Sequence, residues 1–219
     1  MGQLVGLVVA IASVSYLLGS FPTGFLLTQW LKGIDIREQG SGSTGATNVL
    51  RTVGKGPAAL VLLIDALKGS LSVGLVLLLP RLMVMNPAWQ PWLVMLAALS
   101  AIVGHSKPIW LGFRGGKSVA TSIGVILTMT PLVGLSTLAL FGVVLAIWRR
   151  VSLGSIIGAA AVMILMVVFR HPLPYCLLGG VAGGYVILRH RANIGRLLAG
   201  TEPSIGQKLG TGSESTSSV

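Results

Sequence analysis

The chain has 219 residues, of which 53% are hydrophobic and only 10% are charged. Soluble domains carry about 25% charged residues, so this composition excludes an ordinary water-soluble domain. The formal net charge of +11 comes from basic residues between long apolar runs, which indicates one basic face of a membrane protein and not a nucleic-acid-binding surface. A single cysteine, Cys176, excludes a disulfide within the chain.

Six apolar runs approach the length of about 20 residues that a membrane-spanning helix requires. In chain order they cover residues 4–31, 58–79, 92–106, 119–148, 153–169 and 173–188. The fourth run is 30 residues long and contains the helix-breaking pair Thr130-Pro131. It therefore fits either one long span or two short spans that turn back near Thr130.

The distribution of lysine and arginine distinguishes between these two arrangements. If the fourth run forms two spans, 13 of the 16 basic residues lie on one side of the membrane, whereas a single span divides the loop residues 7 against 8. The positive-inside rule favours the first arrangement. We therefore expect an all-α membrane protein with about seven transmembrane helices, an N-terminus outside and a C-terminus in the cytoplasm. The five tryptophans agree, because all lie at predicted span ends.

Residues 1–200 are expected to form a single transmembrane domain, and residues 201–219 a polar, disordered tail. Asp65 and Lys68 are charged residues within a predicted span and stand three positions apart, so we expect a structural ion pair on one helix face. Small residues four positions apart are typical of close packing between membrane helices. Two glycine pairs are assigned this role, namely Gly154 with Gly158 and Gly180 with Gly184.

The first of three glycine-rich or basic segments on the predicted cytoplasmic side covers residues 40–51. Its candidate binding residues are Gly40, Ser41, Gly42, Thr47, Asn48 and Arg51. Alternating glycines allow the backbone to turn its N–H groups toward one point, hydroxyls add donors, and a guanidinium matches the geometry of phosphate. The composition also fits a flexible linker, but the arginine so close to the glycines favours an anion-binding loop.

The second segment ends in Gly115-Gly116-Lys117, immediately before an apolar run. Glycines followed by lysine at the N-terminus of a helix are a suitable anion site. The segment is not a Walker A motif, because residue 111 is leucine where that motif requires glycine.

The third segment covers residues 189–196 and contains His190 and Asn193. It fits a cluster of charges that stops translocation, but it also places a histidine between two arginines, which disfavours protonation of the ring. A neutral imidazole can accept a hydrogen bond or a proton from a substrate hydroxyl. Ser155 stands near the start of the predicted span at residues 153–169, and it either caps that helix or faces the same site. No metal-ligand spacing occurs, so we expect neither a metal site nor a cofactor.

Several motifs together resemble the bacterial acyl-phosphate:glycerol-3-phosphate acyltransferase family. They are residues 19–24 (GSFPTG), 35–37 (DIR) leading into 40–51, 65–69 (DALKG), 104–121, 151–155 (VSLGS) and 189–202. The resemblance runs from about residue 16 to residue 203, in order and in spacing. It implies a seven-helix membrane fold that transfers an acyl chain from acyl phosphate to the sn-1 hydroxyl of glycerol 3-phosphate, giving lysophosphatidic acid and phosphate.

The resemblance also implies a role for each candidate residue. Ser41, Thr47 and the nearby glycines would form a phosphate-binding loop, and the backbone amides of Gly115 and Gly116 would reach the acyl phosphate. The remaining roles are phosphate binding by Arg51 and Lys117, binding of glycerol 3-phosphate by Ser155, His190 and Asn193, and a structural role for Glu202. The residues expected to be catalytic are His190, Asn193 and Ser41. This sequence departs from the family pattern at Ser43, where asparagine is common, and at Ser118, where glycine is usual.

Acyl phosphate is an activated donor with a good leaving group, so a strong enzyme nucleophile is unnecessary. We expect direct attack by the glycerol hydroxyl without an acyl-enzyme, driven by orientation and charge stabilisation. The expected setting is the bacterial plasma (inner) membrane with the site facing the cytoplasm, and the soluble enzyme that makes acyl phosphate is a possible partner. The alternatives are an organic-anion transporter or channel, which would place its sites near the midplane, and a non-catalytic membrane scaffold.

Overall fold

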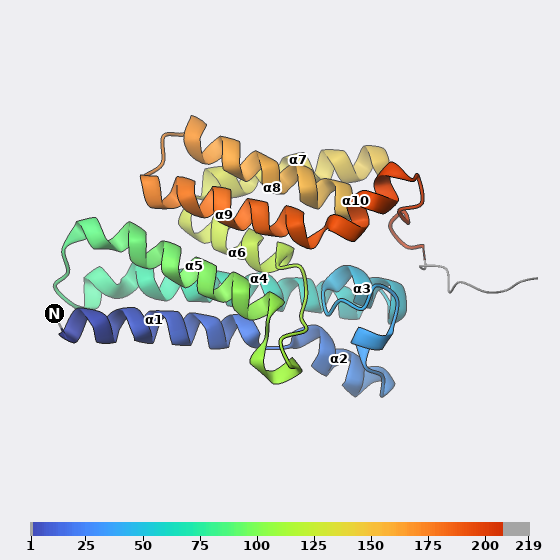
Figure 1. The fold of residues 1–219 in the computed structure, drawn as a ribbon, viewed down its shortest axis with the longest axis horizontal. Coiled ribbons are helices and arrows are strands. Elements are labelled where there is room, and N and C mark those ends of the chain that lie inside the picture. The colour runs from blue at the N-terminus through green and yellow to red at the C-terminus, as the bar shows by residue number, and fades with distance from the viewer. Residues whose placement is uncertain (1, 208–219) are drawn as a thin grey trace, which may run out of the picture.

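The computed structural model describes residues 2–207, and its regular structure there is entirely helical (Figure 1). Long helices lie side by side along one axis and alternate in direction. They are α1 (Gly2–Ser20), α4 (Lys55–Leu82), α5 (Gln90–Ser106), α6 (Val119–Met129), α7 (Pro131–Trp148), α8 (Val151–Val168) and α9 (Leu173–Arg189). Shorter elements join them, namely α2 (Thr23–Lys32), α3 (Ala46–Thr52), α10 (Arg191–Leu198) and the 3-10 helices η1 (Ile36–Glu38), η2 (Pro87–Trp89) and η3 (Ile109–Leu111).

Five helical segments among the described residues are long and apolar enough to cross a membrane. One of them joins α1 to α2, and the others contain α4, α5, α7 and α8. The helices α6 and α9 are apolar but shorter. The chain is therefore a multi-pass membrane protein, as its composition predicts.

Two prolines divide the apolar runs, one as predicted and one not. The fourth run is broken at Thr130, and α6 and α7 then run in opposite directions, as predicted from the charges. The first run was expected to be one helix over residues 4–31, but it is interrupted between Ser20 and Thr23. Pro22 has no N–H to continue the hydrogen-bond ladder, so α2 begins as a separate helix.

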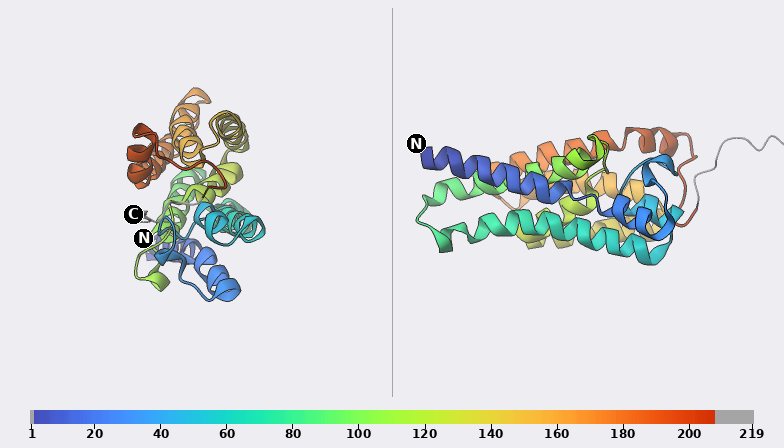
Figure 2. Two further views of the ribbon diagram at one scale, coloured as in Figure 1. Left: turned by 90° about the vertical axis from the view of Figure 1, so that its right-hand side faces the viewer. Right: turned by 90° about the horizontal axis from the view of Figure 1, so that it is seen from below.

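The two ends of the bundle differ in structure and in charge. The helices α2, α3 and α10 gather at the end opposite the N-terminus (Figure 2). Most described basic residues belong to these helices or to the neighbouring loops. Arg81, in the last turn of α4, and Arg170, which follows α8, lie at the other end. Lys208 lies outside the described residues. All five tryptophans are exposed, as lipid-headgroup contact requires.

Glycines allow the helices to approach each other closely. Gly124 of α6 lies against the backbone of Ala66 in α4, where an added Cβ would overlap with the Ala66 carbonyl oxygen. Between α7 and α8, Gly154 packs on the ring of Phe141 and Gly158 packs on a methyl group in α7, so the packing predicted for this pair is confirmed. Such contacts fit membrane interiors, where packing and not water exclusion holds helices together.

The packing predicted for Gly180 and Gly184 is wrong by one position. Nothing lies within 4 Å of a Cβ built on either residue. Their neighbours Gly179 and Gly183 face α8 instead. Both pairs have the same spacing of four, so the sequence pattern cannot tell which of the two faces of α9 meets the neighbouring helix.

Replacing Gly124 with alanine should destabilise the protein, because the new methyl group must displace the backbone of α4. Overpacking of this kind costs about 1–3 kcal/mol, which corresponds to a fall of several degrees in the melting temperature of a chain of this size. The matched control is Gly142→Ala, since nothing lies within 4 Å of a Cβ at that helical glycine. Thermal unfolding in detergent measures both, and equal melting temperatures for the two variants would contradict the packing described.

Candidate active site

A cavity of about 380 Å³ opens among the loops and helix ends at the end of the bundle that carries α3 and α10. All three segments singled out from the sequence contribute to it. The predicted residues that line it are Ser41, Thr47, Asn48, Arg51, Asp65, Lys117, Ser155, His190, Asn193 and Glu202. The predicted residues that do not are Gly40, Gly42, Lys68, Gly115 and Gly116.

Asn48 organises the first loop with its side chain. Its Oδ1 accepts a hydrogen bond from the backbone N–H of Ser41 over 3.0 Å. Its Nδ2 lies 2.9 to 3.1 Å from the carbonyl oxygens of Ile36, Gln39 and Ser43. The side-chain amide is engaged within the protein and shapes the loop around it, while the substrate-binding role expected for Asn48 stays a prediction.

The glycines of the first loop are required by its backbone. Gly40 and Gly42 adopt φ values of 55° and 66°, in the left-handed region that favours glycine. A Cβ on Gly40 would also overlap with Asn48 Oδ1. These two residues therefore shape the loop that presents Ser41 to the cavity, and do not line the cavity themselves.

The helix α3 carries Arg51 into the cavity wall. The Nε atom of Arg51 is buried and has no hydrogen-bond partner within residues 2–207. Burial lowers the pKa of Arg51, and the carboxylate of Glu202 acts in the opposite direction. A buried, unpaired guanidinium donor facing a cavity is suited to an anionic ligand.

The second loop does not use its glycine amides as expected. The N–H groups of Gly115 and Gly116 donate to the carbonyl oxygens of Ser106 and His105, over 3.2 and 3.3 Å. These carbonyls lie at the C-terminus of α5, where helical partners are missing, so the glycine turn completes the end of that helix. The prediction that both amides reach a ligand is therefore wrong for this conformation. Of the three residues predicted in this loop, Lys117 lines the cavity.

Ser118 occupies the position directly before α6 with a φ of 63°. This left-handed conformation is strained for a residue with a side chain. The buried Ser118 hydroxyl donates to the carbonyl of Ile102 over 2.8 Å. This chain thus accommodates a serine in the left-handed conformation at this position.

Glu202 connects the C-terminal segment to the site. Its Oε1 accepts hydrogen bonds from Ser152 Oγ and Asn193 Nδ2, both over 2.7 Å, and its Oε2 accepts one from Arg196 Nε over 2.7 Å. The hydrogen bond from Asn193 Nδ2 to Glu202 fixes the orientation of the Asn193 amide. Its Oδ1 atom then accepts a hydrogen bond from Lys117 Nζ. The described part of the predicted tail therefore packs into the site, whereas the disorder predicted for the tail falls largely on residues 208–219, outside the described residues.

The buried position of the site lowers the pKa of two groups. Burial, with the guanidinium groups of the neighbouring arginines, lowers the pKa of Lys117 to about 8. Burial and the nearby Lys117 lower the pKa of His190 to about 4. His190 Nδ1 lies 2.8 Å from the carbonyl oxygen of Val186, which can only accept, so the neutral ring carries its proton on Nδ1. Its Nε2 is then an acceptor.

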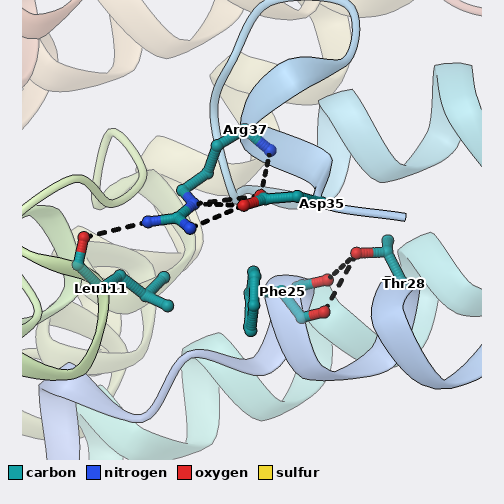
Figure 3. Close-up of polar contacts among 6 residues, drawn as sticks. Phe25, Thr28, Asp35, Arg37 and Leu111 are labelled. Atoms are coloured by element: carbon teal, nitrogen blue, oxygen red, sulfur yellow. Dashed lines mark hydrogen bonds and ion pairs between the residues drawn. The ribbon is translucent and has the colours of Figure 1, made fainter. Parts of the chain in front are cut away.

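Arg37 connects the segment before the first loop to η3, the element before the second loop (Figure 3). Its guanidinium contacts both oxygens of Asp35, with Nη2 at 2.6 Å from Oδ2, and donates to the carbonyl of Leu111 in η3 over 3.1 Å. The guanidinium carbon also lies 5.1 Å from the centre of the Phe25 ring, a cation–π contact. The hydrogen bond from Arg37 lowers the pKa of Asp35 and keeps this link charged.

An apolar cavity of about 60 Å³ adjoins the polar one. It lies between α5, α6, α7, α8 and α9, and its walls are almost entirely apolar. Five residues line both cavities, namely Val119, Ile123, Leu138, Phe141 and Ser155. Cationic groups thus line one cavity, and hydrocarbon side chains line the neighbouring one across a shared wall. A ligand with an anionic head and an apolar chain would match both parts.

A family model for glycerol-3-phosphate acyltransferases matches residues 9–200. The chain belongs to the glycerol-3-phosphate acyltransferase family. A glycerol-3-phosphate acyltransferase of Trichormus variabilis is 60% identical over 98% of this chain and 99% of that protein. One from Synechococcus elongatus is 56% identical over 93% of this chain and 97% of that protein.

Two solved structures of the family have the same fold. Both are of PlsY, an integral membrane glycerol 3-phosphate acyltransferase, in its glycerol 3-phosphate form and its lysophosphatidic acid form. The first superposes with a TM-score of 0.81 at 34% identity, covering 93% of this chain and 96% of PlsY. The second gives a TM-score of 0.77 at the same identity, over 90% and 94% of the two chains.

Two ionisable residues that line the cavity of this acyltransferase were not selected as candidates from the sequence. His105 is buried at the end of α5, and Lys55 begins α4. A histidine two residues before a predicted basic loop offers some indication of a functional role. For Lys55 no pattern distinguishes it from the other basic residues at the ends of spans.

Proposed function

We propose that this chain transfers an acyl chain from acyl phosphate to the sn-1 hydroxyl of glycerol 3-phosphate, giving lysophosphatidic acid and inorganic phosphate. The observation that carries this proposal is the adjacent pair of cavities, one lined by Arg51 and Lys117 and the other by hydrocarbon side chains between the helices. Both substrates bear phosphate, and one of them bears an acyl chain. Membership of the acyltransferase family supports the same reaction.

In the proposed step the glycerol hydroxyl oxygen attacks the acyl carbonyl carbon and forms the ester bond. The bond between that carbon and the bridging phosphate oxygen breaks, and phosphate leaves with the electron pair. Among the described residues no serine hydroxyl hydrogen-bonds to His190; Ser152 donates to Glu202 and Ser155 donates to Val151. An activated serine nucleophile needs such a base, so this arrangement supports direct attack without an acyl-enzyme.

The hydroxyl proton has two possible acceptors, His190 Nε2 and a phosphate oxygen of the substrate. The Nε2 atom is free to accept, because Nδ1 is held by Val186. A His190 pKa of about 4 makes the ring a weaker base than a phosphate dianion, whose second pKa is about 6. We therefore favour a role in which His190 orients the hydroxyl by a hydrogen bond and the departing phosphate takes the proton.

Turnover of acyl phosphate by the purified protein tests the proposal. Wild-type protein with acyl phosphate and labelled glycerol 3-phosphate should yield labelled lysophosphatidic acid, and acyl-CoA and acyl-carrier protein should serve as comparison donors. His190→Ala should lower kcat by about 10²-fold at saturating substrate. Full turnover by His190→Ala would remove its catalytic role. If no donor gives lysophosphatidic acid while liposomes containing the protein take up glycerol 3-phosphate, the alternative of an organic-anion transporter replaces the enzyme.

The reaction should slow as Lys117 loses its proton. Lys117 is cationic below its pKa of about 8 and neutral above it, so the KM values for both phosphate-bearing substrates should rise above pH 8. Both substrates stay dianionic there, so they do not cause the change. The measurement is kcat/KM between pH 7 and 10 for the wild type and for Lys117→Arg, which keeps its charge throughout. A decline at the same pH in both proteins would assign it to another group.

We further propose seven membrane spans in the bacterial plasma membrane, with the N-terminus outside and the site facing the cytoplasm. The concentration of basic residues around the site supports this orientation. The same basic face would meet the soluble enzyme that supplies acyl phosphate.

Cysteine labelling in intact cells tests the orientation. In a Cys176→Ser background, Arg170→Cys should react with a membrane-impermeant maleimide from outside. Lys107→Cys, at the opposite end of the bundle, should react only after the cells are permeabilised. Both native side chains are exposed in the structure, so access within the protein is not limiting. The reverse labelling pattern would place the site outside.

A further inference from the structure

A chain of buried polar side chains lies behind the glycine turn of the second loop, and the proposed reaction does not use it. The Asp65 carboxylate in α4 lies 2.9 Å from Lys68 Nζ and 3.7 Å from His105 Nδ1 in α5. Thr23, at the start of α2, donates to the same Asp65 oxygen over 3.1 Å. Lys68 also donates over 3.0 Å to the carbonyl of Phe21, at the break between α1 and α2. The ion pair predicted from the sequence is therefore present, but it is part of a larger cluster.

The ring of His105 is the surface on which Gly116 rests. A Cβ built on Gly116 would overlap with His105 Nε2 and would lie 3.1 Å from the two adjacent ring carbons. The Gly116 N–H donates to the His105 carbonyl, and Arg189 at the end of α9 donates to the Gly116 carbonyl over 3.0 Å. Lys117 follows directly. The backbone position of Lys117 is therefore fixed by the contacts that Gly116 makes with α5 and α9.

The polar groups of this cluster do not serve only to fill space between the helices. Buried charged groups in a membrane bundle are costly, and apolar side chains of similar volume would pack there with a smaller desolvation cost. A carboxylate beside Nδ1 restricts the orientation of an imidazole ring, as it does for histidines that bind metals or act in catalysis. At 3.7 Å the Asp65 carboxylate is beyond hydrogen-bond distance of His105 Nδ1, which has no hydrogen-bond partner among residues 2–207, so burial of the ring and attraction to the nearby carboxylate hold its Nε2 edge against Gly116.

We propose that His105, buried beside the Asp65–Lys68 ion pair, is a positioning residue that holds the Gly115-Gly116 turn so that Lys117 reaches the substrate phosphate. This inference rests on the proposed function of the Lys117 site. It assigns the cluster to the binding of phosphate and not to proton transfer. It also links the position of Lys117 to the helix break at Pro22, through the bonds of Thr23 and Lys68 to Asp65.

A four-protein cycle tests the contact directly, using wild type, Gly116→Ala, His105→Ala and the double variant. Gly116 does not have a positive φ, so alanine there adds a steric contact and no backbone strain. Gly116→Ala should raise the KM for the phosphate-bearing substrates about tenfold in the wild-type background, and less than about threefold when the ring of His105 is absent. An equal effect in both backgrounds would overturn the proposal.

Further variants separate positioning from simple support of the fold. His105→Asn keeps an amide donor near the position of Nδ1, facing Asp65, so its KM should lie between those of wild type and His105→Ala. His171→Ala, a histidine in the loop at the opposite end of the bundle, should leave the KM values unchanged. A lower melting temperature in His105→Ala with unchanged KM values would mean that the ring only stabilises the fold, and the proposal would fall.

Inorganic phosphate provides a measurement that does not depend on turnover. The rise in melting temperature caused by phosphate should be reduced in Gly116→Ala and recovered in part in the double variant. If wild type forms no lysophosphatidic acid but shows this pattern, the positioning role stands and the proposed function fails. If phosphate does not stabilise the wild type at all, the positioning role is overturned as well.

Discussion

Mutual repulsion among the basic side chains that line the cavity is the constraint on which the remaining structure depends. These cations are gathered in a partly buried space, and the lowered pKa of Lys117 reflects both the burial and the repulsion. Two features of the structure offset this repulsion when no ligand is bound. Glu202 supplies a carboxylate that orients Asn193 toward Lys117, and glycine contacts between helices make the supports of the loops rigid. An anionic ligand completes the balance of charge.

Much of the architecture follows from properties that are local in sequence. Apolar length defines the spans, the asymmetry of basic residues separates α6 from α7, and a spacing of three places Asp65 beside Lys68. Family membership and most of the polar residues that line the cavity could likewise be predicted, because glycines, hydroxyls and cations are concentrated in three short segments. None of these features requires knowledge of which segments meet in space.

The features that were not predicted depend on two segments together. The amides of Gly115 and Gly116 are taken by the end of α5, a partner that the composition of the loop does not reveal. Asn48 serves its own loop because three carbonyls converge on it only after folding. The packing face of α9 was assigned one residue too far along the chain, since hydropathy locates a membrane helix without fixing its rotation about its axis.

The position of Glu202 has a consequence for how the protein matures. This residue follows every membrane helix in the chain, yet it bonds to Ser152 at the start of α8 and to Asn193 in α10. Because Glu202 follows the described membrane helices, a chain still emerging from the ribosome presents those helices before it presents this carboxylate. Synthesis therefore orders the process: insertion comes first, and a complete site can form only after the last helix has been released.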